Sequence, residues 1–279
     1  MGNLDKKEQI DKKVEELNDK KEDSRSQEEI LVSQLCDGME AYEHHKKKVF
    51  LSALTAGLEI GFSYLLIVIL VNFLSDKFSE ESIFYITAFA YPVGFIIVVL
   101  GKSILFTEQT SLLTLPVLHK KRTFWELLQL WAIVISGNLL GGIVMTFLVV
   151  LIGVNLGITS YESSAIIAKH VFKGSYLTIF FSAIMAGWLM ALLSWLLSSS
   201  EEFISKIIII YIITFIVGFA GFHHSIVGNI EVFAGLIFTK SISFVEYLIF
   251  LPTALFGNAI GGVFFVALLR YRSFAANAQ

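Results

Sequence analysis

Two adjacent histidines, His223 and His224, lie in the stretch GFAGFHHSIVGNIEVFAGLIF at residues 218–238, which is otherwise almost entirely apolar and rich in glycine. A neutral imidazole can donate a hydrogen bond from one nitrogen and accept one at the other. Ionisable side chains in such surroundings are costly and are therefore functional candidates, although a histidine that only bridges packed helices is the alternative. We expect His224 to be able to bind a small carboxylate or to supply it with a proton.

The same histidines make a poor metal site. His223 and His224 are neighbours rather than four residues apart, so they do not present two ligands on one helical face. Glu231 follows His224 by seven residues and could pair with it, but no cluster of Asp or Cys accompanies them. No His-Glu-x-x-His or nucleophile-elbow pattern occurs in the sequence. We therefore predict no metal, no cofactor and no enzymatic activity, and nothing in the sequence points to a nucleic acid partner.

The chain that carries these residues has the composition of a membrane protein. It has 279 residues, of which 55% are hydrophobic and only 16% are charged. A helix needs about 20 apolar residues to cross a bilayer, and strands of a membrane barrel would instead alternate over segments of about 10 residues. Six apolar runs predict an all-α protein with six transmembrane helices: Leu51–Phe73, Ile83–Leu118, Leu127–Val154, Tyr176–Leu197, Phe203–Phe238 and Phe244–Leu269.

Charge divides the chain into a membrane domain and two tails. Residues 1–48 form a charged tail, 49–272 the membrane domain and 273–279 a short second tail. Ile10, Val14 and Leu17 have helical spacing, so the first tail is either a short amphipathic helix or a solvated segment. The single cysteine, Cys36, excludes an intrachain disulfide.

Basic residues near the ends of the apolar runs predict the orientation in the membrane. They lie before the first run, between the second and third, and after the last, at Lys46–Lys48, Lys120–Arg122, Arg270 and Arg272. Because such residues favour the cytoplasmic side, we expect both termini to be cytoplasmic and the protein to lie in the cytoplasmic (inner) membrane. Lys169 and Lys173 lie in a loop on the expected outer side and weaken this bias.

The membrane domain contains an internal repeat of three spans. The two copies occupy about 49–154 and 176–272, and an odd number of spans predicts that the second copy enters the membrane from the opposite side. In such inverted repeats the transport path lies between the halves. The matched motifs are SALTAG (52–57) with SAIMAG (182–187), SGNLLGG (136–142) with FGNAIGG (256–262), and ILFTEQTS with GFHHSIVGN.

Two of the apolar runs are too long to be single helices. Residues 83–118 and 203–238 each contain 36 residues, which as one helix would measure about 54 Å against a hydrocarbon core of about 30 Å. We expect breaks within FTEQT (106–110) and FHHSIVGN (222–229). Thr107 and Ser225 have side chains suited to cap the following half-helices, whose starts would attract a small anion.

These motifs resemble the formate/nitrite transporter family of microbial anion channels. LFTEQT is similar to the family's threonine loop in the second span, GFHHSIVGN to its histidine loop in the fifth, and the GN..GG motifs lie on the matching helices. The resemblance covers residues from about 45 to 272. It implies an aquaporin-like protomer with broken helices two and five, a homopentamer with one pore per protomer, and transport of formate, nitrite, hydrosulfide, acetate or lactate.

The resemblance also implies roles for individual residues. Thr107 and His224 fall on the family's pore threonine and central histidine, and a basic residue is expected at the outer vestibule, with Lys173 the first candidate and Lys169 the second. The remaining expected pore residues are Ser225 and Asn229 beside the histidine, Leu105, Phe106, Tyr91 and Phe95 at the apolar constrictions, and His223 as a packing or vestibule neighbour.

Three positions depart from the family pattern. Ile104 replaces the usual acidic residue before the pore threonine, Ala191 replaces a pore asparagine, and Lys102 adds a charge that either reaches the interface or forms an anion site. These departures make the chain more similar to a divergent, poorly characterised bacterial branch of the family than to its well-studied channels. The substrate is accordingly left open.

A transport mechanism follows as a hypothesis. A bare anion loses several kcal/mol of hydration in an apolar constriction, so we expect Lys173 to attract it, Thr107 and His224 to hold it, and a proton to accompany it. A water or glycerol channel is one alternative, but Pro92, Pro116 and Pro252 form no Asn-Pro-Ala element. A non-conducting sensor with the same fold is the other.

Overall fold

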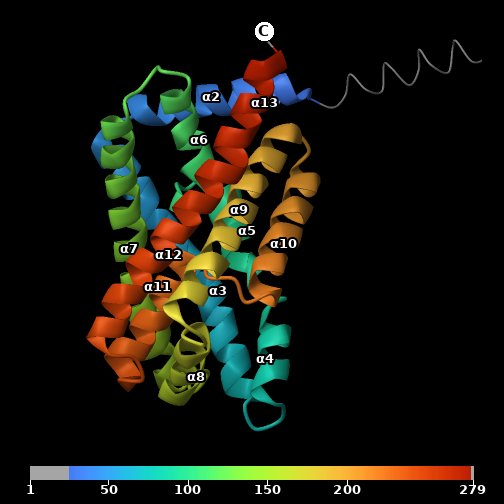
Figure 1. Ribbon diagram of the computed structural model, residues 1–279. Coiled ribbons are helices and arrows are strands. Elements are labelled where there is room, and N and C mark those ends of the chain that lie inside the picture. The colour runs from blue at the N-terminus through green and yellow to red at the C-terminus, as the bar shows by residue number, and fades with distance from the viewer. Residues whose placement is uncertain (1–24, 278–279) are drawn as a thin grey trace, which may run out of the picture.

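The computed structural model describes residues 25–277, and these residues form helices joined by short loops, with no strand in that range. The all-α prediction is confirmed, whereas the segment around Ile10, Val14 and Leu17 lies outside the described residues. Figure 1 shows the arrangement of the helices, which are α2 (Gln27–Glu43), α3 (Lys46–Leu74), α4 (Glu80–Thr87), α5 (Pro92–Leu100), α6 (Phe106–Leu118), α7 (Phe124–Asn155), α8 (Tyr161–Val171), α9 (Tyr176–Ser199), α10 (Phe203–Phe219), α11 (Ser225–Ala234), the π-helix η1 (Gly235–Thr239), α12 (Phe244–Gly262), the π-helix η2 (Val263–Leu268) and α13 (Leu269–Asn277).

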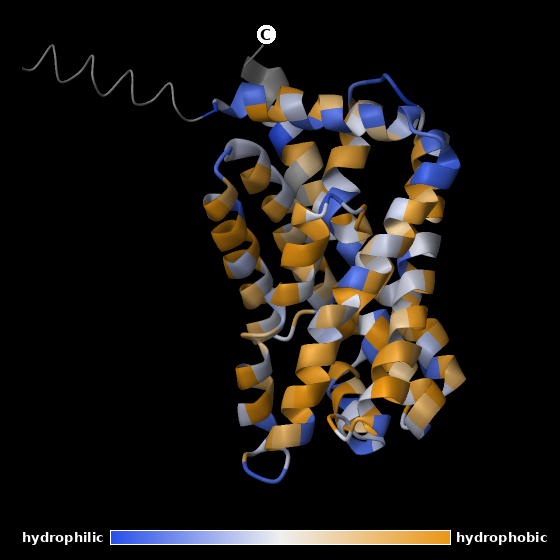
Figure 2. Ribbon diagram, turned by 180° about the vertical axis from the view of Figure 1, so that it is seen from behind, coloured by the Kyte–Doolittle hydropathy of each residue, from blue (hydrophilic) through white to orange (hydrophobic). Residues whose placement is uncertain are grey.

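Five helical segments in the described part of the chain are long and apolar enough to cross a membrane: α3, α4 with α5, α7, α9 and α12. The sequence predicted six. The run that falls short is the fifth, because α10 has 17 residues and the apolar chain then continues as the separate helix from Ser225 to Thr239. Apolar residues cover the body of the bundle and polar ones gather at its two ends, as a helical protein in a bilayer requires (Figure 2).

Part of the charged tail is a packed helix rather than a solvated segment. Ser26 and Glu29 form a capping box at the start of α2, and Ile30 and Leu31 are buried. The amide nitrogen of Gln34 donates to the hydroxyls of two serines on α9. Figure 1 shows α2 lying across one end of the bundle, opposite the end that carries α8.

Small residues bring two pairs of helices into close contact. Gly57 of α3 lies against the backbone of Asn138 on α7, and Gly187 of α9 lies against the backbone of Asn258 on α12. A Cβ atom at either glycine would overlap these backbone atoms, so only glycine permits the approach. The motifs that match within the sequence therefore contact each other in the fold, SALTAG with SGNLLGG and SAIMAG with FGNAIGG.

Both over-long runs are interrupted, the first just before FTEQT and the second at the beginning of FHHSIVGN, where Phe222, His223 and His224 lie outside the helices. α5 ends at Leu100 and α6 begins at Phe106, so FTEQT is helical; α10 ends at Phe219 and α11 begins at Ser225. The break follows a left-handed residue in each case, Lys102 (φ 57°) or Gly221 (φ 65°). The next amide then bonds back five residues, from Ser103 to Val98 and from Phe222 to Val217. This is a Schellman closure, which ends a helix regardless of the polarity of the residues that follow.

Candidate functional site

The start of α6 is held by a side chain from another helix. The backbone N–H of Phe106 donates to Asn138 Oδ1 (2.8 Å), and Asn138 Nδ2 donates to the carbonyls of Ala53 (2.7 Å) and Ile104 (2.9 Å). The N-cap residue is Leu105, whose side chain cannot cap. The prediction that Thr107 caps this helix is therefore wrong, because the chain turns helical two residues earlier and Asn138 supplies the acceptor.

The start of α11 has the same support. Ser225 N–H donates to Asn258 Oδ1 (2.8 Å), and Asn258 Nδ2 donates to the carbonyls of Ala183 (2.8 Å) and His223 (2.9 Å). The N-cap residue is His224 rather than Ser225, so the capping role predicted for Ser225 is also wrong. Its buried hydroxyl has no hydrogen-bond partner among the residues that the structure describes.

His224 joins the two helix starts. Its Nδ1 accepts from the backbone N–H of Val227 (3.2 Å), and its Nε2 lies 2.5 Å from Thr107 Oγ1 on α6. Since a backbone N–H can only donate, Nδ1 is the acceptor, and the proton of the neutral ring is on Nε2, directed at the threonine oxygen. His224 and Thr107 are 2% and 0% exposed, and the ring of Phe95 meets the imidazole edge to face with centroids 5.1 Å apart.

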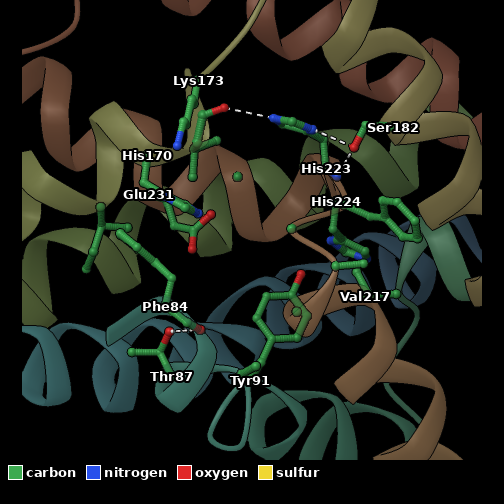
Figure 3. Close-up of a pocket in the computed structure, with 18 of the residues that line it drawn as sticks. Phe84, Thr87, Tyr91, His170, Lys173, Ser182, Val217, His223, His224 and Glu231 are labelled. Atoms are coloured by element: carbon green, nitrogen blue, oxygen red, sulfur yellow. Dashed lines mark hydrogen bonds between the residues drawn. The ribbon is translucent and has the colours of Figure 1, made fainter. Parts of the chain in front are cut away.

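A cavity of about 410 Å³, here called the α8 cavity, reaches His224 from the end of the bundle that carries α8. Figure 3 shows its polar lining. His224 and Tyr91 lie at its inner part, His170 and Lys173 come from α8 and the loop after it, and Glu231 projects from α11. Of the two expected vestibule lysines, the structure brings Lys173 to this cavity, while Lys169 is not part of its lining.

The other two histidines of the α8 cavity, His223 and His170, are held by contacts with neighbouring residues. His223 Nε2 donates to the carbonyl of Val171 (2.8 Å), and Nδ1 lies 2.8 Å from the hydroxyl of Ser182, so both ring nitrogens are occupied. His170 stacks on Phe84 with ring centroids 3.4 Å apart. Burial, followed by the charge of Lys173, lowers the pKa of His170 to about 4. His170 is therefore neutral near pH 7, and it adds no positive charge beside Lys173.

A second cavity of about 800 Å³, the α2 cavity, opens on the opposite side of the His224–Thr107 contact, beneath α2. Lys102, Ile104 and Glu108 line it from the loop before α6 and from α6 itself. Asp37 faces it from α2, and burial, with Glu40 adding, raises the pKa of that carboxyl group. The α2 cavity thus reaches the residue after Thr107, while the α8 cavity reaches His224.

Buried apolar side chains separate the two cavities. Leu105, Phe106 and Phe95 are at most 1% exposed and line neither cavity. Asn229 also lies outside both linings: its Nδ2 donates to Leu139 O (3.3 Å) and its Oδ1 accepts from the Tyr247 hydroxyl (2.7 Å). Ala191 is buried in an apolar cluster with Leu115 and Trp195.

Sequence reasoning missed the residues that support this site. Asn138 and Asn258 lie in the two glycine-rich packing motifs, and the signal that points to them is an asparagine at the same place in both motifs, within apolar helices. For Glu231 the sequence indicates only a pairing with His224 in a weak metal site. No hydrogen bond or ion pair joins it to His224 in the described part of the chain, yet both line the α8 cavity.

The helices have an apolar outer surface, two helix starts meet at a buried polar contact, and a cavity lies on either side of that contact. These features characterise a membrane transport protein. The family model described as "Formate/nitrite transporter" matches residues 28–272. The chain belongs to the formate/nitrite transporter family, and the resemblance found in the motifs is confirmed.

Individual relatives agree with this assignment. The chain is 29% identical over 239 residues to the inner membrane protein YfdC of Escherichia coli (strain K12), covering 84% of this chain and 74% of that protein. It is 28% identical over 179 residues to the formate channel BtFdhC of Bacillus thuringiensis, covering 63% and 68%. Among solved structures, a pentameric formate channel with formate bound superposes with a TM-score of 0.70 at 21% identity, covering 82% of this chain and 98% of that one.

Proposed function

We propose that this protein conducts small monovalent anions of weak acids, such as formate or nitrite, through a pore in each protomer. The observation that carries the proposal is the contact between His224 Nε2 and Thr107 Oγ1, which joins two helix starts between two cavities. Helix starts favour anions, and the formate channel of Bacillus thuringiensis supports formate as a substrate.

The proposed architecture has six membrane segments in two inverted halves, about 49–154 and 176–272, with broken second and fifth segments. The equivalent contacts of Asn138 and Asn258 support it, because each asparagine holds one helix start and two carbonyls. Both termini are cytoplasmic in this proposal, so α2 covers the inner end of the pore. The protomers form a homopentamer in the lipid bilayer, as the pentameric formate channel of similar fold does.

Thr107 and His224 form the proposed anion-binding centre. Because Nε2–H of His224 donates to Thr107 Oγ1, the hydroxyl hydrogen of the threonine is free to donate to an anion. Lys173 lies at the α8 cavity and raises the local concentration of anions there. The starts of α6 and α11 add partial positive charges that attract an anion. Unlike a buried lysine or arginine, they need no acidic side chain beside them.

The apolar side chains beside this centre make a proton necessary. Transfer of an ionised carboxylate past Leu105 and Phe106 would cost many kcal/mol, and a neutral acid avoids most of that cost. The anion therefore crosses as the protonated acid or together with a proton. A channel for neutral solutes and a non-conducting sensor are the outcomes that would contradict this proposal.

Stopped-flow measurements on proteoliposomes test the function directly. We expect the wild-type protein to move formate or nitrite at least tenfold faster than empty vesicles and to leave glycerol flux unchanged. Thr107→Val removes the hydroxyl while keeping the shape of the side chain, and should reduce anion flux about tenfold, the loss of a hydrogen bond to a charged group. Thr107→Ser retains the hydroxyl and serves as the control. Glycerol flux alone, or no flux of any anion, would refute the proposal.

A further inference from the structure

Glu231 is a buried carboxyl group that the proposed mechanism does not use. It lies on α11, two turns beyond His224, is 9% exposed and projects into the α8 cavity (Figure 3). Neither an ion pair nor a hydrogen bond of its carboxyl group occurs within residues 25–277. A carboxylate without a partner is unfavourable in such a place, and binding a proton removes the cost.

The surroundings of Glu231 contain one permanent cation. Lys173 is exposed at the α8 cavity and is not within ion-pair distance of Glu231. The hydroxyl of Tyr64 donates to Ser164, and the hydroxyl of Tyr247 on α12 donates to Asn229. The titratable or charged groups that face Glu231 from the neighbouring elements are Tyr64, Tyr91, His170, Lys173, His223 and His224.

None of the three histidines is arranged to give up a proton easily. His224 uses Nδ1 to accept from Val227 and Nε2 to bond Thr107. His223 is bonded at both nitrogens. His170 is stacked on Phe84 and neutral near pH 7. Glu231 is the one carboxyl group among the described residues that line the α8 cavity, and no hydrogen bond commits its proton to another group.

We propose that Glu231 is the proton-binding residue of the α8 cavity and protonates the weak-acid anion before it passes His224. The O–H bond of the Glu231 carboxyl group breaks, and a new O–H bond forms on the anion, so a neutral acid and a Glu231 carboxylate result. Water in the cavity then returns a proton to Glu231 from the same side. The carboxylate repels a second anion until that happens, so one proton accompanies each anion. This inference rests on the proposed function.

Glu231→Gln tests the coupling, because it keeps the size of the side chain and removes its proton. In proteoliposomes with formate and an enclosed pH dye, the wild-type protein should take up one proton per formate at a rate that does not respond to membrane potential. In Glu231→Gln the ratio of protons to formate should fall at least fivefold, and the flux should follow the potential. Glu231→Asp should restore coupling, and Glu162→Gln, in the exposed first turn of α8, is the matched control.

An infrared measurement tests proton binding without transport. The pH-dependent carbonyl band of protonated carboxyl groups should be the same in the wild-type protein and in Glu162→Gln, and it should lose one component in Glu231→Gln, because other carboxyl groups such as Asp37 and Glu108 contribute the remainder. An unchanged band and an unchanged proton ratio in Glu231→Gln would overturn the inference while the proposed function stands. A wild-type protein that moves no anion would refute the proposed function itself. Ammonium or rubidium uptake that Glu231→Gln abolishes would overturn the inference, since the carboxylate would then serve a cation.

Discussion

The starts of α6 and α11 share a support but differ in their chemistry. At each start an asparagine from a neighbouring long helix, Asn138 or Asn258, accepts from the first helical N–H and donates to one carbonyl just before the helix and to one carbonyl of α3 or α9. The N-cap residue is Leu105 in one case and His224 in the other. The comparison distinguishes the asparagines, which hold the breaks in the membrane helices, from the N-cap residues, of which only His224 can act on an anion.

The difference also explains why one histidine can serve both helix starts. His224 caps its own helix through Nδ1 and reaches the other through Nε2. Leu105 does neither, but its side chain is completely buried and contributes to the apolar barrier. Thr107 provides the polar atom of the α6 side. The two halves thus share a single polar contact, to which one contributes Thr107 and the other His224.

The largest effect is expected when the shared support is removed. Asn138→Leu and Asn258→Leu each remove the acceptor of a buried helix N–H and the donor to the carbonyl of Ile104 or His223, and each also removes the second hydrogen bond of a helical carbonyl, that of Ala53 or Ala183. We expect each change to lower the stability of the protein by about 2–5 kcal/mol, because unsatisfied buried groups cost about 1–3 kcal/mol each. Thermal unfolding in detergent, followed by tryptophan fluorescence, measures the loss.

Asn138→Asp and Asn258→Asp sharpen this test. Each keeps an oxygen for the helix N–H but has no amide group for the two carbonyls, so it should be destabilising as well. Equal losses in the two halves would support an equivalent role. A loss confined to one half would show that the asparagines are not equivalent, and the idea of a common support would have to be abandoned.

Next in size are the changes at His224. His224→Ala should reduce anion flux at least tenfold and lower stability by about 1 kcal/mol, the usual value of an N-cap. His224→Asn keeps a capping side chain but has no atom at the position of Nε2. We therefore expect it to retain stability while losing flux to the same extent, as measured in parallel by unfolding and by stopped flow. Normal flux in both variants would remove His224 from the mechanism.

A smaller effect is expected at the mouth of the α8 cavity. Lys173→Ala removes the one permanent charge among the described residues that line the α8 cavity. Lys169→Ala removes a charge from the same segment, but Lys169 does not line the cavity. We expect the half-saturating formate concentration to rise about threefold for Lys173→Ala at low ionic strength, and to change little for Lys169→Ala or at high salt, where screening weakens the field. Equal responses would mean that general surface charge, not the cavity, attracts the anion.

The sequence predicted the helical class, the segments that are interrupted and the pairing of Thr107 with His224. Length decided the first two, since 36 apolar residues exceed a bilayer, and the motif match decided the third. It placed the first break several residues too late, whereas the second predicted break overlaps the observed one at Phe222–His224. FTEQT is the polar part of the first run, but the Schellman closure at Lys102 ends the helix before it.

The asparagine supports and the unpartnered Glu231 could not be derived in the same way. Their roles depend on contacts between residues 32 to 85 positions apart, such as Asn138 with Phe106 and with Ala53. A polar residue within an apolar run is recognisable from the sequence, but the sequence does not show which backbone atoms its side chain bonds. Asn229 illustrates the opposite error, since its position beside His224 suggested the pore, whereas its side chain bonds Leu139 and Tyr247.

The last expected effect concerns stability alone and distinguishes the two helix ends that precede the breaks. Lys102 and Gly221 occupy equivalent places and both have a left-handed backbone conformation. Glycine adopts this conformation without strain, whereas lysine does not. Lys102→Gly should therefore raise stability by about 1 kcal/mol, and Gly221→Ala should lower it by about as much, because nothing lies near a Cβ at Gly221 and only the backbone is affected. Lys102→Ala removes the charge but keeps the strain, so it should not stabilise. If it stabilised as much as Lys102→Gly, the charge at the α2 cavity rather than the backbone would be the source of the gain.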